Sequence, residues 1–80
     1  MTLSLRELEE LVARRKWLLS EIRRLEERYG MSSAEFIESW REGLIPEPED
    51  PEVHGDFLVW EALIEELREV EERLTSAGGG

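Results

Sequence analysis

The sequence contains no cysteine, asparagine or glutamine, and its longest run of apolar residues is the four from Phe57 to Trp60. Without cysteine the chain forms no disulfide and no thiolate metal site, which leaves its redox compartment undetermined. A membrane-spanning helix needs about 20 mostly apolar residues, so we expect none. Met1 is followed by a charged amphipathic segment in place of an apolar leader, and the expected location is cytoplasmic.

Positive charge is scarce in the second half of the chain. Residues 1–40 carry eight acidic and seven basic side chains, whereas residues 41–80 carry twelve acidic and three basic ones. The net charge is −10. Because an acidic surface repels phosphate, this balance disfavours nucleic acid and favours a basic protein partner.

Charged residues as a class are abundant and make up 38% of the chain. High charge without amide side chains is typical of thermophilic proteins. Arginine outnumbers lysine nine to one, which a GC-rich genome would also produce.

A long amphipathic helix is predicted over residues 5–29. Ser4 and Glu7 form a capping box at its start, and Gly30 is suited to end it because glycine adopts positive φ at low cost. Apolar side chains recur at steps of three and four, which places them on one face of the helix. This stripe contains Leu8, Leu11, Leu18, Ile22, Leu25 and Tyr29, with Leu5, Val12 and Leu19 at its edge.

A short helix is predicted over residues 33–42. Ser32 and Glu35 form a second capping box, and Met31 and Phe36 form a hydrophobic staple around it. Gly43 then ends the helix, with Leu44 folding back against it.

A loop over residues 45–55 and a last helix over residues 57–74 complete the chain. Three prolines interrupt the loop, and Asp56 is a suitable N-cap for the helix. Trp40 and Trp60 lie on the apolar faces of their helices and are assigned to the core. Residues 76–80 are expected to form a flexible tail.

Residues 1–75 are therefore expected to form one all-α domain, in which two long helices pack as an antiparallel hairpin bridged by a short helix. A two-helix hairpin leaves one flank of each apolar stripe exposed, and the short helix covers only one end. We expect dimerisation or a partner protein to complete the open flank near Leu5, Leu8 and Val12.

Arg15 and Trp17 are the candidate anchors of this interface. Arg15 lies within the apolar stripe, where it either pairs with Glu66 or Glu69 of the last helix or extends its head group into water. Trp17 lies off the stripe beside arginines, and is either an exposed interaction residue or covered by the loop or the short helix. The predicted partner interface is Leu5, Leu8, Val12, Arg15 and Trp17.

No catalytic, cofactor or metal site is predicted. The segment from Asp50 to Glu61 partly matches a calcium-binding loop, but His54 replaces an oxygen ligand and prolines disrupt the entering helix. His54 has no neighbouring nucleophile to activate. The basic side chains of the first helix are interrupted by glutamates and lack an aromatic platform for nucleic acid.

Two segments of the chain, RYGMSSAEFIESWREG and HGDFLVWEALIEELREVEERL, are joined by a loop rich in proline and acids. Together they resemble a class of small helical prokaryotic proteins often found as the small partner in toxin–antitoxin pairs. The resemblance covers Leu18 to Leu74, and its markers are Tyr29, Gly30, Met31, Ser32, Phe36, Gly43, Asp56, Trp60 and Glu61. It implies a helical fold and a protein partner, and it assigns no active residue. The chain has no ribbon-helix-helix strand and no helix-turn-helix for binding DNA.

Two functions are therefore expected, neither of them enzymatic. In the first, the chain is an acidic, antitoxin-like subunit that binds and neutralises a basic protein. In the second, two copies pair through the same flank into a structural four-helix bundle.

Overall fold

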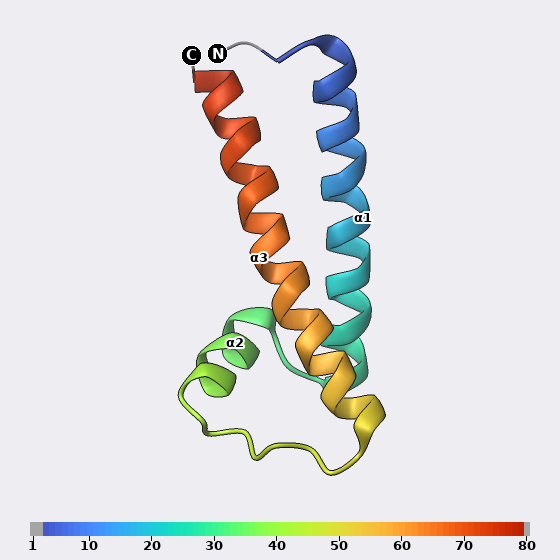
Figure 1. Ribbon diagram of the computed structural model, residues 1–80, viewed down its shortest axis with the longest axis vertical. Helices are drawn as coiled ribbons and strands as arrows, with labels where there is room; N and C mark the ends of the chain where they lie inside the picture. Colours follow the sequence, from blue (N-terminus) through green and yellow to red (C-terminus); the bar gives the residue numbers. More distant parts are fainter. Residues whose placement is uncertain (1–2, 80) are drawn as a thin grey trace.

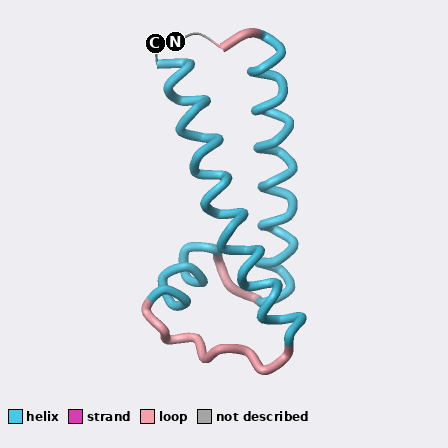
Figure 2. Tube along the Cα trace, in the orientation of Figure 1, coloured by secondary structure: helices cyan, strands magenta, loops and turns pink. Residues whose placement is uncertain are grey.

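The computed structural model describes residues 3–79, and the side chains of residues 3–76. It consists of α1 (Leu5–Tyr29), α2 (Ser33–Arg41) and α3 (Pro51–Gly79). Helices α1 and α3 lie antiparallel, and α2 packs beside the first turns of α3 at one end of the hairpin (Figure 1). The predicted all-α hairpin with a short bridging helix is confirmed. A single extended loop joins α2 to α3 across this end (Figure 2).

Local hydrogen bonds fix the turn between α1 and α2. The side chain of Ser4 caps α1, and that of Ser32 caps α2 by accepting the N–H of Glu35. Gly30 ends α1 with a φ of 65°, and its N–H donates to the carbonyl of Glu26. The carboxylate of Glu26 also accepts the N–H of Ser33 at 2.7 Å. One residue therefore satisfies free backbone groups at the end of one helix and the start of the next.

The end of α2 follows the predicted pattern in its backbone only. Gly43 has a φ of 74°, and the N–H of Leu44 donates to the carbonyl of Ser39 at 2.8 Å. This closes the helix one residue earlier than expected, at Arg41. The side chain of Leu44 is exposed, so the predicted apolar contact is wrong.

Helix α3 begins six residues before the predicted start, at Pro51 instead of Phe57. Asp50 is the residue that caps it: its carboxylate accepts the N–H of Glu52 at 2.9 Å, and its carbonyl accepts that of His54 at 3.0 Å. Proline is tolerated in the first turn because its missing N–H would have no partner there. The helix also continues past its predicted end at residue 74, into the segment expected to be a tail, and ends at Gly79; Gly80 lies outside the described residues.

An aromatic cluster joins the three helices. Trp60 is fully buried, and its ring stacks on Phe36 with centroids 4.0 Å apart and planes 1° apart. Its indole N–H donates to the hydroxyl of Ser33 at 2.9 Å. Tyr29 of α1 stacks on the same indole, and Phe57 packs against Tyr29 and Phe36. Trp40 is partly exposed and packs against this core, so the assignment to the core is confirmed for Trp60, and Trp40 lies at its edge.

The remainder of the hairpin is thin. Leucine, isoleucine and valine side chains between α1 and α3 form the only core above α2 in the described residues, and they include Leu11, Leu18, Leu63 and Val70. The molecule measures 45 × 21 × 18 Å, with a radius of gyration of 15.0 Å. A compact domain of this length would have a radius of gyration of about 11.6 Å. Within residues 3–79, no helix is both long and apolar enough to cross a lipid bilayer.

Two glycines provide a matched test of the observed helix boundaries. Gly55 lies inside α3, and a methyl group added there meets no atom within 4 Å. We expect Gly55→Ala to raise the free energy of unfolding by about 0.5–1 kcal/mol, because alanine is the better helix former. Gly30→Ala should lower it by about 1 kcal/mol, because positive φ strains a residue with a side chain. Chemical unfolding followed by circular dichroism measures both. Destabilisation by Gly55→Ala would contradict the early start of α3.

The hydrogen bond between Trp60 and Ser33 can be measured by a double-mutant cycle. Ser33→Ala leaves a buried indole donor without a partner, so we expect a loss of about 1–2 kcal/mol in the free energy of unfolding. In the Trp60→Phe background the same change should cost little, giving a coupling energy of about 1 kcal/mol. Ser20→Ala on the exposed side of α1 is the matched control and should change stability by less than about 0.5 kcal/mol.

Candidate protein-interaction surface

A line of exposed apolar side chains runs along α1. Leu5 is 71% exposed, Leu8 40% and Val12 54%, and Leu19 is also exposed. These residues are separated by three, four and seven positions, which places them on one side of the helix. The line continues into Ile22, which is buried against α3. It therefore borders the seam between the two long helices.

The lower part of this seam forms an open groove of about 670 Å³. Ile22 of α1 and Ile64 and Leu67 of α3 provide its apolar lining, and Leu19 stands at its edge. Ser33, the first residue of α2, lines the groove at the end nearest that helix. The short helix thus marks where the exposed seam begins.

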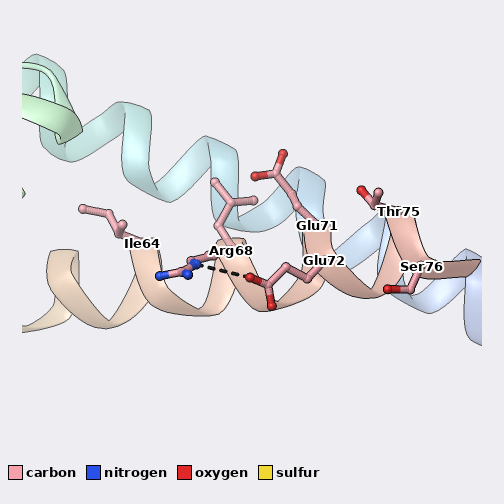
Figure 3. A pocket seen from close by; sticks show the side chains of 7 residues that line it. Ile64, Arg68, Glu71, Glu72, Thr75 and Ser76 are labelled. Atoms are coloured by element: carbon pink, nitrogen blue, oxygen red, sulfur yellow. Dashed lines mark hydrogen bonds and ion pairs between the residues drawn. The ribbon is translucent and has the colours of Figure 1, made fainter. Parts of the chain in front are cut away.

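A second groove of about 610 Å³ continues along α3 and shares Ile64 and Leu67 with the first. Its polar rim comes from the later turns of α3 and includes Arg68, Glu71 and Glu72 (Figure 3). The Arg68 side chain donates to the Glu72 carboxylate at 3.2 Å within this rim. We call the apolar line of α1, the Arg15–Glu71 ion pair beside it and the two grooves the groove face. Its members are Leu5, Leu8, Val12, Arg15, Leu19, Ile22, Arg23, Glu26, Ser33, Ile64, Leu67, Arg68, Glu71, Glu72, Thr75 and Ser76.

Arg15 joins this face through an ion pair, but its partner differs from the two glutamates that the sequence predicted. Its guanidinium lies 3.2 Å from the carboxylate of Glu71, not from Glu66 or Glu69. Glu66 is instead taken by the neighbouring Arg14, at 2.6 Å. The Arg15 head group therefore bridges α1 and α3 beside the second groove, which Glu71 lines, while keeping part of its surface in water.

Trp17 lies away from the groove face. Two residues of α-helix rotate a side chain by about 200°, so Trp17 and Arg15 point to different sides of α1. Trp17 is 47% exposed, and the Cζ atom of Arg14 lies over its ring, 4.5 Å from the ring centroid. Neither the loop nor α2 buries it. The structure thus places four of the five predicted interface residues on one surface and Trp17 on another.

Four apolar residues of the groove face were absent from the predicted interface: Leu19, Ile22, Ile64 and Leu67. Their sequence spacing identified them as members of apolar stripes, which does not separate a core position from an open edge. Only the angle at which α1 and α3 meet makes that distinction.

The groove face differs from the rest of the molecule in charge. Its basic side chains, Arg15, Arg23 and Arg68, equal in number its acidic ones, Glu26, Glu71 and Glu72. The whole chain has twice as many acidic as basic residues. The excess of acid therefore lies outside the groove face.

A polar cluster at the lower end of the hairpin serves the fold. The hydroxyl of Tyr29 donates to the carboxylate of Asp56 at 2.6 Å, and Arg28 lies 3.0 Å from the same carboxylate. Burial, and then the hydrogen bond to Asp56, raise the pKa of Tyr29 above its ordinary value. The imidazole of His54 lies 3.5 Å from the carboxylate of Glu47. In the described part of the chain, no three acidic or histidine side chains are grouped as a metal site requires.

Comparisons with known proteins found no matching family model, no similar curated protein and no similar solved structure.

The raised pKa of Tyr29 predicts a specific loss of stability at high pH. The folded chain holds the phenolic proton more tightly than the unfolded chain, so this contribution is fully present below about pH 10 and disappears as the pH rises through the folded-state pKa. Between about pH 9 and pH 11 we expect the free energy of unfolding to fall more steeply in the wild type than in Tyr29→Phe. Urea unfolding measures this, and tyrosinate absorbance reports the single tyrosine directly. Equal slopes in the two proteins would contradict the assignment.

Proposed function

We propose that the chain is a protein-interaction module and that the groove face binds an amphipathic helix. The observation that supports this most directly is the exposed line Leu5, Leu8, Val12 and Leu19 beside an apolar seam that only two helices form. Large exposed apolar side chains in one contiguous line favour a docking surface, whereas scattered ones need no explanation.

The shape of the surface favours a helix over a small ligand. Small molecules bind in concave sites that enclose most of their surface. The two grooves are instead open strips that adjoin along α3, and the apolar line on α1 runs alongside them. An amphipathic helix laid along such a strip places side chains at steps of three and four into it.

The charge outside the groove face favours a basic protein as the partner. Glu65 and Glu69 lie exposed on α3, and the loop before α3 adds further acids. Such a field speeds the approach of a basic protein, and the effect weakens with salt. This is the antitoxin-like role that the sequence resemblance implies. The exposed Trp17–Arg14 pair offers a second contact point for the same partner.

A photo-crosslinking amino acid placed at Val12 tests the proposal. In a lysate of the source cells we expect Val12 to form one adduct of defined mass, identified by mass spectrometry, because its side chain lies on the groove face. The matched control is Ala13, the next residue, which is exposed and rotated by about 100° around α1.

An adduct that forms equally from Val12 and Ala13, or from neither, would contradict an interface at the groove face. For a basic partner, adding salt should slow the formation of the adduct, whereas an uncharged contact would be insensitive to salt. An adduct of the chain with itself still identifies the groove face as an interface.

A further inference from the structure

We infer that a second copy of this chain occupies the groove face, in antiparallel orientation, so that two hairpins form a four-helix bundle. The inference rests on the proposed function, because it takes the groove face to be an interface and names its occupant. Four properties of the described residues support it: exposed area, charge, the position of α2 and the symmetry of the apolar line.

The chain exposes more surface than a compact monomer of its mass, and the excess is close to the area that one chain buries in a typical dimer interface. The chain exposes 5934 Å². A compact protein of this mass exposes about 5,000 Å². The excess of about 900 Å² is close to the roughly 800 Å² that each partner buries in a standard interface.

The mixed charge of the groove face allows a second copy to bind there, whereas the acidic surfaces outside it would attract a basic partner. A two-fold contact places the same surface against itself. Its charged side chains therefore attract one another only where both acidic and basic ones are present. The groove face carries three arginines and three glutamates, whereas the chain as a whole carries a charge of −10. Two copies would repel through their acidic surfaces and can approach through the balanced one.

The position of α2 selects the antiparallel arrangement. Ser33 at the start of α2 lines the groove face near one end of the hairpin, and among residues 3–79 no short helix lies at the other end. In a parallel pair the two short helices would meet at the same end. With a two-fold axis across the hairpin, each short helix lies beyond the end of the other copy that is farther from that copy's own α2.

The apolar line is symmetric under this operation. Reversing the helix about the point between Ala13 and Arg14 exchanges Leu8 with Leu19 and Leu5 with Ile22. Leucine therefore meets leucine or isoleucine on both sides of the axis. Val12 and Arg15 exchange at the centre, where Glu71 of the same chain already neutralises Arg15.

Sedimentation velocity of the full chain and three variants tests the inference. We expect the wild type to sediment at twice the chain mass of 9.4 kDa. Leu8→Glu and Leu19→Lys should each sediment at the mass of one chain. In a dimer of either variant, both contacts between positions 8 and 19 would place a charged side chain against leucine. Leu58→Glu is the matched control: Leu58 is a 49% exposed leucine of α3 outside the groove face, and its dimer should persist.

Mixing the two disruptive variants tests the orientation. In the antiparallel pair, the glutamate introduced at position 8 of one chain meets the lysine introduced at position 19 of the other. The second contact remains leucine against leucine, so the mixture should re-form a dimer. In a parallel pair, position 8 meets position 8 and position 19 meets position 19, so the glutamate and the lysine would not meet. The same mixture covers the case in which either variant unfolds alone, because its helicity would return on mixing.

Each result has a defined consequence. A folded wild type that sediments as one chain overturns the second copy, and the proposed function survives if Val12 still crosslinks to another protein. A wild-type dimer that neither charged variant disrupts shows that copies pair elsewhere, and this also overturns the inference. Failure of the mixture to dimerise, where each variant alone is a folded monomer, overturns the antiparallel arrangement.

Discussion

The stacking of Trp60 on Phe36 is the contact on which the arrangement of the three helices depends. The two rings are nearly parallel, with centroids 4.0 Å apart, and the indole N–H reaches the first residue of α2. An aromatic pair of this kind adds about 0.5–1.5 kcal/mol to the burial of its own area. Because Tyr29 also stacks on the indole, the cluster locates the end of α1 as well. Helix α2 is too short to hold its place by propensity alone, and this cluster supplies what it lacks.

The aromatic side chains are concentrated at the α2 end of the hairpin, and this distribution leaves the opposite end with a small, partly exposed core. At the α2 end, three helices surround Trp60, which is fully buried. At the opposite end, two helices meet along aliphatic side chains alone, and a layer of two helices cannot cover both of its edges. The open seam beside Leu8 and Leu19 is therefore a consequence of where the aromatic residues lie in the chain. The same asymmetry leaves the molecule longer and more exposed than a compact domain of its size.

The sequence predicted most of the fold because its helix ends are encoded locally. Ser4, Ser32, Gly30 and Gly43 act as cap residues through backbone groups within a few positions. The predicted start of α3 was wrong because Asp56 and Asp50 are both suitable N-caps, and in the structure Asp50 caps the helix whereas Asp56 accepts a hydrogen bond from Tyr29 of α1. The pairing of Arg15 with Glu71 was missed for a related reason, since the relative shift of α1 and α3 decides which glutamate lies opposite. Trp17 was included in the predicted interface because a tryptophan beside arginines has the composition of an interaction residue, although its position in the helix already placed it off the apolar stripe.

Helix α1 begins and α3 finishes at the same end of the hairpin, opposite the end where α2 lies (Figure 1). A polypeptide joined covalently at either place would be held beside the open seam and away from the aromatic cluster. Tethering of this kind raises the local concentration of the attached segment into the millimolar range for short flexible linkers. The architecture thus allows a neighbouring domain or a genetic fusion to engage the hairpin as an intramolecular partner without disturbing the residues that hold it together.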